Sequence, residues 1–73
     1  MKIRTQDARQ YIEYGEAYTA DYGGWSVVFV RTRYQPKPVL AGIYEDEERS
    51  KGVLYEMGTA YKNQERIYYM PVV

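Results

Sequence analysis

Cysteine and histidine are absent from the chain, and these two absences exclude most of the common catalytic and metal-binding chemistry. Without cysteine there is no disulfide and no thiolate ligand, and without histidine the commonest general base and metal ligand is missing. The only serines are Ser26 and Ser50, and no histidine is available to activate them. A chain of 73 residues can also scarcely enclose a cleft around paired carboxylates. We therefore expect a protein that is not an enzyme and that uses no cofactor and no small-molecule substrate.

The chain also lacks long hydrophobic runs and any excess of charge of one sign. Its longest uninterrupted apolar stretch is Val27-Val28-Phe29-Val30, which is too short for a membrane span or for the core of a signal peptide. Ten lysines and arginines balance ten acidic residues, so the net positive field typical of a nucleic-acid-binding domain is missing. These features predict a cytoplasmic protein without a membrane partner.

An acidic run at residues 45–48 is followed by Arg49 and Ser50, and its oxygen-bearing side chains invite comparison with a calcium-binding loop. An EF-hand loop beginning at Asp46 needs glycine at its sixth position and glutamate at its twelfth, where this chain has Lys51 and Met57. We therefore expect no metal site. We interpret residues 45–52 as a solvated loop or a short helical turn that ends at a glycine.

Tyrosine takes the place of the other aromatic residues, because the chain has ten tyrosines, one phenylalanine and one tryptophan. A tyrosine ring is apolar, but its hydroxyl needs a partner when it is buried, so tyrosine suits surfaces that are partly wet and partly dry. A small core cannot satisfy every one of these hydroxyls. We interpret the tyrosines as a mixture of core and interface residues, and rigid aromatic side chains at a surface favour binding to another macromolecule.

The pattern of residues 5–18 predicts a helix at the N-terminal end of the domain. One buried face follows the i, i+3, i+4, i+7 spacing with Ala8, Tyr11, Ile12 and Gly15. Thr5 or Asp7 can cap this helix, and Gln10 follows Asp7 by three residues as in a capping box.

Four segments are rich in β-branched and aromatic residues and predict strands over residues 25–34, 39–44, 53–57 and 66–70. Residues 27–30 are apolar on both faces of their strand, which is typical of a central strand. Pro36 and Pro38 cannot donate ladder hydrogen bonds, so residues 35–38 connect the first two strands as a hairpin. A rival interpretation makes residues 44–57 a second helix, but Gly52 and the Val-Leu-Tyr run after it argue against this helix.

Together these elements predict a single α+β domain over residues 1–73, with one N-terminal helix packed on a three- or four-stranded antiparallel sheet. The strand over residues 25–34 leaves the core with a basic end that contains Arg31 and Arg33. We expect the acidic run at residues 45–48 to lie at or near the same end of the hairpin. It would then cancel the field of these arginines.

Five residues are our candidates for contact with a partner: Tyr14, Tyr18, Arg31, Arg33 and Tyr34. The first two are expected on the predicted helix and the other three at the basic end of the strand. Exposed aromatic rings between separate basic and acidic patches suit recognition of a protein surface, because charge adds specificity and association rate. We expect a monomer that binds a protein complex, although residues 68–73 form an apolar segment that could also pair with a second copy.

Two alternatives use the same tyrosine-rich surface. One is a small nucleic-acid-binding module that stacks bases on Tyr34, Tyr68 and Tyr69, with basic residues contacting the phosphates. The other is an inhibitor of a host defence nuclease, which would act on a protein and protect foreign DNA.

The chain as a whole resembles the small RNA-polymerase-binding transcription regulators of Xanthomonas bacteriophages. The resemblance rests on its 73 residues, the absence of cysteine and histidine, one amphipathic helix and tyrosine-rich strands, and it transfers no functional residue. It implies a phage-encoded, non-enzymatic inhibitor in the cytoplasm of the host bacterium. Such an inhibitor binds the large catalytic subunits of RNA polymerase, displaces the σ factor at initiation and lets elongation pass terminators.

Overall fold

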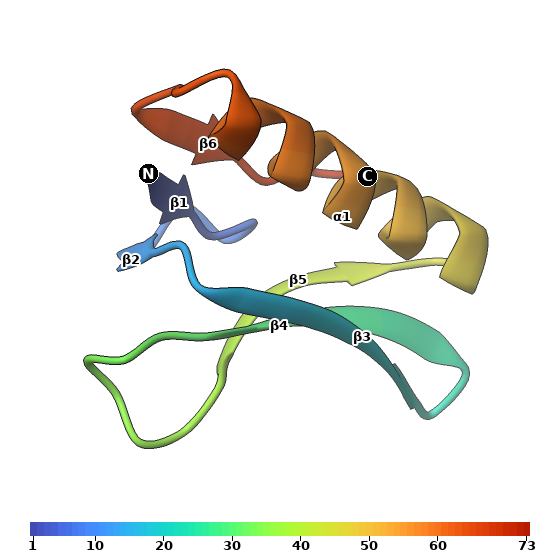
Figure 1. The fold of residues 1–73 in the computed structure, drawn as a ribbon. Coiled ribbons are helices and arrows are strands. Elements are labelled where there is room, and N and C mark those ends of the chain that lie inside the picture. The colour runs from blue at the N-terminus through green and yellow to red at the C-terminus, as the bar shows by residue number, and fades with distance from the viewer.

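Two three-stranded sheets and one helix make up the computed structural model, which describes residues 1–73. The larger sheet is antiparallel and has the strand order β3 (Glu16–Tyr22), β4 (Trp25–Arg31) and β5 (Val39–Tyr44). The smaller sheet has the order β2 (Tyr11–Glu13), β1 (Lys2–Arg4) and β6 (Ile67–Tyr69), with β1 antiparallel to β2 and parallel to β6. The helix α1 (Glu47–Lys62) and the smaller sheet lie on the same side of the larger sheet (Figure 1).

The predicted α+β class is confirmed, and the strands number six instead of three or four. Strands β4 and β5 form the predicted hairpin, with a register from Ser26 opposite Tyr44 to Val30 opposite Val39. Strand β4 ends at Arg31, so residues 32–34 belong to the connection. Strand β6 lies within the last predicted segment.

The predicted helix over residues 5–18 is wrong, because these residues form a turn, strand β2 and the first part of β3. The Thr5 hydroxyl donates to the Asp7 carboxylate at 2.7 Å and Ala8 has a φ of 60°, so the polar residues that suggested a helix cap stabilise a turn. Ile12 is buried opposite Ile3 of β1, which follows the two-residue period of a strand.

The helix lies instead at residues 47–62, so the predicted strand over residues 53–57 is wrong, and the rival interpretation of a helix over residues 44–57 is closer to the structure. The Asp46 carboxylate caps the helix by accepting a hydrogen bond from the Arg49 backbone N–H at 2.8 Å. Ser50, Val53 and Met57 follow a spacing of three and four residues and form its buried stripe. Gly52 lies inside this helix and faces open space, so it does not interrupt the helix.

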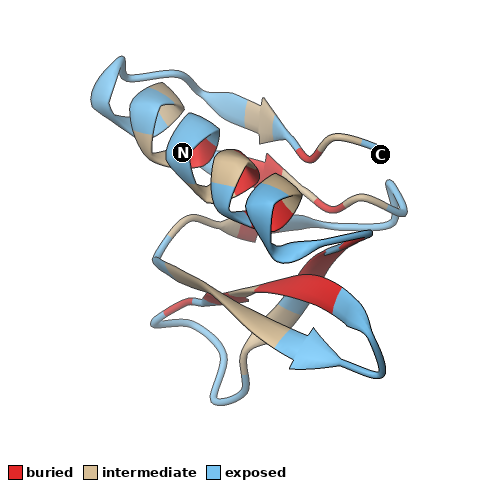
Figure 2. Ribbon diagram, turned by 90° about the vertical axis from the view of Figure 1, so that its right-hand side faces the viewer, coloured by how far each residue is buried: buried red, intermediate tan, exposed pale blue.

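The core fills the space between α1, the smaller sheet and the inner face of the larger sheet. Buried residues lie on the side of the helix that faces the sheets, and the opposite side of the helix is exposed (Figure 2). Nine hydrophobic side chains form this core: Ile3, Ile12, Val28, Val30, Ala41, Tyr44, Val53, Met57 and Met70. Burying such side chains contributes about 1.5–3 kcal/mol each. All of these side chains lie on the helix side of the larger sheet, so the core packs against only one of the two faces of that sheet.

Candidate protein-binding face

One face of the β3-β4-β5 sheet is covered by no other part of the chain, since α1 and the smaller sheet both lie on its other side (Figure 1). Side chains alternate along a strand, and the inner side is fixed by Val28 and Val30, which belong to the core. Residues directly opposite in an antiparallel pair share a face, so the register assigns the rest. We call the apolar part of the uncovered side the outer face; its residues are Tyr18, Tyr22, Trp25, Val27, Phe29, Leu40 and Ile43.

The outer face carries large apolar side chains in contact with solvent. Tyr22 is 72% exposed and Trp25, its partner across the strands, is 55% exposed. The rings of Tyr18 and Phe29 stack with their centroids 5.7 Å apart. Val27 is buried although no helix or strand covers it, so it is shielded by the larger side chains around it. A contiguous apolar patch of this kind is typical of an interaction surface.

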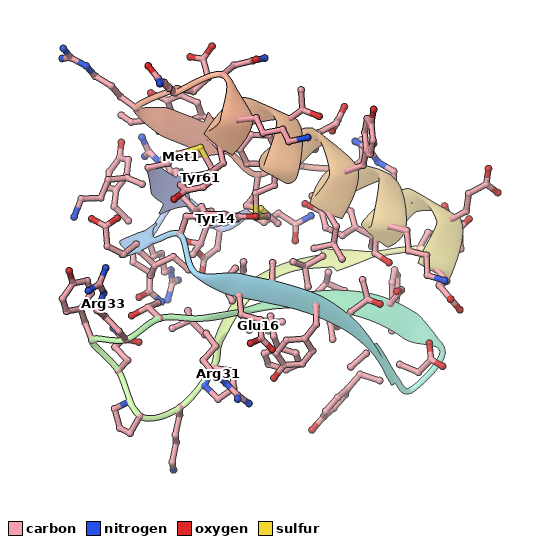
Figure 3. The ribbon with its side chains drawn as sticks, in the orientation of Figure 1. Met1, Tyr14, Glu16, Arg31, Arg33 and Tyr61 are labelled. Carbon is pink, nitrogen blue, oxygen red and sulfur yellow. The ribbon has the colours of Figure 1, made fainter.

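Four of the five predicted contact residues line one open hollow of about 380 Å³: Tyr14, Arg31, Arg33 and Tyr34. Glu13 and Glu16 line the same hollow, so its charge is mixed. Tyr14 points toward Met1 and Tyr61, on the helix side, whereas Glu16 and Arg31 point the other way (Figure 3). The structure therefore brings these four residues together around one hollow, although their side chains point in different directions.

Tyr14 and Tyr18 do not lie on a helix, contrary to the prediction. Tyr14 precedes β3 and packs its ring against that of Tyr61, with centroids 4.7 Å apart. Tyr18 lies within β3 on the outer face and does not line the hollow. The two tyrosines are on opposite sides of the sheet, because Tyr14 reaches the core and Tyr18 stacks on Phe29.

The acidic run at residues 45–48 lies at the opposite end of the larger sheet from Arg31 and Arg33. Strand β5 runs from the 32–38 connection to residue 44, and six residues of strand span roughly 20 Å. The expectation that residues 45–48 would lie near Arg31 and Arg33 is therefore wrong. Neither arginine forms an ion pair, and the Arg33 guanidinium lies 5.6 Å from the centre of the Tyr34 ring. The acidic run therefore does not offset these arginines, and the acidic side chains beside them are those of Glu13 and Glu16.

The alternative set of stacking tyrosines is not brought together. Tyr34 borders two hollows near β2, whereas Tyr68 and Tyr69 line a groove between β6 and α1. Tyr34 does share one hollow with Tyr11 of β2, which the Arg4 guanidinium approaches at 5.2 Å from the ring centre.

Two tyrosines on the helix side have raised pKa values. Burial raises the pKa of Tyr44 to about 12, and its hydroxyl donates to the carbonyl oxygen of Pro71 at 2.9 Å. Burial, together with the Glu56 carboxylate, raises the pKa of Tyr68. Both hydroxyls therefore remain protonated near neutral pH and act as hydrogen-bond donors in contacts away from the outer face.

The structure defines a small α+β protein with one uncovered aromatic sheet face. No three acidic side chains come together in a group that could hold a metal ion. Helix α1 is not long and apolar enough to cross a membrane. No family model, curated protein or solved structure matches the chain.

Proposed function

We propose that this protein acts by binding another protein through the outer face of the β3-β4-β5 sheet. The single observation that supports this function is the exposure of Tyr22, Trp25, Leu40 and Ile43 on one side of a sheet that the chain leaves uncovered. Large aromatic side chains at the centre of an interface contribute most of its binding energy when they are desolvated. Tyr18 belongs to this surface, and Arg31 lies at one end of it, directly opposite Glu16.

The first partner to test is bacterial RNA polymerase, the target that the resemblance implies. In this proposal the protein is a non-enzymatic inhibitor in the bacterial cytoplasm that displaces the σ factor and promotes antitermination. The charge distribution supports a binding mode with one orientation, because a partner would meet Arg31 at one end of the outer face and Glu45 near the other.

Affinity capture with matched variants tests the proposal. The tagged protein is used as bait in a bacterial lysate treated with nuclease, and retained proteins are identified by mass spectrometry. We compare the wild type, the double variant Tyr22→Ser/Trp25→Ser and the control Tyr11→Ser, whose ring is exposed on the smaller sheet. Wild type and control should retain the large polymerase subunits with little σ factor, and the double variant should lose them. Equal retention by all three baits, or no retained protein, would contradict the proposal.

A second candidate function is binding of single-stranded nucleic acid at the basic end. It is favoured by one observation: Arg31 and Arg33 form no ion pair, and they line one hollow together with the exposed ring of Tyr34. Binding through phosphates weakens steeply as salt rises, because counterions are released. Titration with an oligothymidine at low and at physiological salt, with Arg33→Gln as the variant, separates this function from protein binding at the outer face.

A further inference from the structure

A groove of about 530 Å³ runs between α1 and β6, on the side of the molecule away from the outer face. The helix contributes Tyr55, Glu56 and Thr59 to its walls, and the segment after the helix contributes Glu65, Tyr68 and Tyr69. Figure 1 shows β6 beside the C-terminal half of α1, with β1 and β2 beneath them. The groove is therefore built from two elements that pack on the same core.

Aromatic rings form much of this groove and are left exposed. Tyr55 is 78% exposed and Tyr69 is 60% exposed, although both border the same hollow. Tyr68 is half-buried, and its hydroxyl donates a hydrogen bond to Oε1 of Glu56 at 3.2 Å. This bond holds the Glu56 carboxylate beside the rings, where its second oxygen can accept a further donor.

The groove carries negative charge only. Glu56 and Glu65 both line it, no lysine or arginine does, and neither glutamate belongs to an ion pair of the chain. Lys62 and Arg66, which are close in sequence, do not line the groove. The faces of the tyrosine rings add to this preference, because the ring quadrupole attracts a cation placed over it.

The edge of β6 provides a backbone on which an extended segment can dock. Strand β6 pairs with β1 alone, so one of its edges has no partner strand. An unpaired edge offers N–H and C=O groups to a peptide in the extended conformation, while pockets beside it select the side chains.

We propose that this groove binds an extended peptide segment of a partner protein through an arginine side chain. The guanidinium stacks on the exposed rings of Tyr55 and Tyr69 and pairs with the carboxylates of Glu56 and Glu65. Arginine fits better than lysine, because its planar fork can stack on a ring and donate two parallel hydrogen bonds to one carboxylate. This inference concerns a second surface and does not depend on the function proposed for the outer face.

The test is an NMR titration of the folded protein with two capped pentapeptides that differ at one position. Both have the sequence Gly-Val-X-Val-Gly, with X either arginine or citrulline, which has the same shape without the charge. The arginine peptide should shift the amide resonances of Thr59, Ala60 and Tyr69 and should bind about tenfold more tightly than the citrulline peptide, a difference of about 1.4 kcal/mol.

Glu56→Gln is the matched variant, because the glutamine carbonyl oxygen can still accept the Tyr68 hydrogen bond. It should weaken the preference for arginine, because one of the two carboxylates is lost, while leaving the citrulline peptide unaffected. Glu48→Gln, two turns away on the same helix, should keep the full preference. The proposal is overturned by equal binding of the two peptides to the wild type, by shifts centred on Tyr22 and Trp25, or by no shifts at millimolar peptide. Each of these outcomes leaves the Tyr22→Ser/Trp25→Ser test of the outer face unchanged.

Discussion

The hydroxyl oxygens of Ser26 on β4 and Ser50 on α1 lie 2.6 Å apart, and both residues are buried where the helix crosses the sheet. The Ser50 hydroxyl also donates to the carbonyl oxygen of Glu47 at 3.0 Å. A hydroxyl has one hydrogen to donate, so Ser26 is the donor in the bond between the two serines. The pair is therefore directional, with Ser50 as both donor and acceptor.

This direction predicts unequal effects of two similar substitutions. Ser50→Ala leaves the buried Ser26 donor without its acceptor and should lower the free energy of unfolding by about 1–3 kcal/mol. Ser26→Ala leaves the Ser50 donor satisfied by Glu47 and should cost about 0.5–1.5 kcal/mol. Urea denaturation of both variants and of the double variant measures the difference. A larger loss for Ser26→Ala than for Ser50→Ala would show that the assigned direction is wrong.

Gly15 and Gly58 should respond to alanine with opposite signs. A Cβ at Gly15 would collide with the backbone carbonyl oxygen of Arg31, which cannot move without distorting the end of β4. Gly15→Ala should therefore destabilise the fold by more than about 2 kcal/mol, as overpacking against backbone does. Gly58 lies inside α1 with open space around it, so Gly58→Ala should stabilise the fold by about 0.4–1 kcal/mol. Thermal unfolding of the two variants decides the signs, and a stabilised Gly15→Ala would refute the close approach.

Much of the larger sheet could be predicted from the sequence, because its pattern is local. The β-branched run of β4, the two prolines after it and the next apolar run specify a hairpin with few alternatives. The helix was misplaced because Thr5, Asp7 and Gln10 have the right residue types for a capping box, and these same types also stabilise turns. The true helix has a serine, Ser50, in its buried stripe, so its apolar periodicity is weak in the sequence.

The sequence does not predict the outer face, because the helix expected over residues 5–18 takes in the first part of β3 and no strand is expected between residues 16 and 22. Residues 27–30 of β4 are apolar on both sides, and this continuous run correctly indicates a central strand. A single helix and a small second sheet can cover only one side of that strand. The sequence therefore does contain a signal for an uncovered face: β4 has apolar side chains on both sides, and the chain has enough other elements to cover only one of them.

Tyr44 should make the stability of the fold decrease at alkaline pH. Burial raises its pKa from 10.0 to about 12 in the folded protein, so folding favours the protonated hydroxyl. Its contribution is fully present below pH 10 and is lost as the pH rises through 12. Urea denaturation between pH 9 and 12 should show this loss, and Tyr44→Phe should reduce the slope. Tyr68 has a raised pKa for a similar reason, so the slope should decrease in the variant without vanishing.

Gln6 should control the order of the β5 edge and of the chain after β6. Its side-chain Oε1 accepts from the Ile43 backbone N–H at 2.8 Å, and its Nε2 donates to the carbonyl oxygens of Ile43 and Val72 at 3.0 and 2.9 Å. One side chain thus occupies the free edge of β5 and ties residues 71–72 to it. Hydrogen bonds of this kind contribute about 0.5–1.5 kcal/mol each, less where they are exposed to water.

Gln6→Ala should therefore open this edge locally without unfolding the core. The exchange rate of the Ile43 amide hydrogen should rise by at least about tenfold, because a loss of about 1.4 kcal/mol in local opening corresponds to that factor. The amide of Val28 lies in the central strand and exchanges only through global unfolding, so its exchange rate should stay at the wild-type value. Native-state hydrogen exchange followed by NMR measures both amides in one sample. If the Ile43 amide kept its protection in Gln6→Ala, the edge would be held by the sheet itself, and Gln6 would have no protective role.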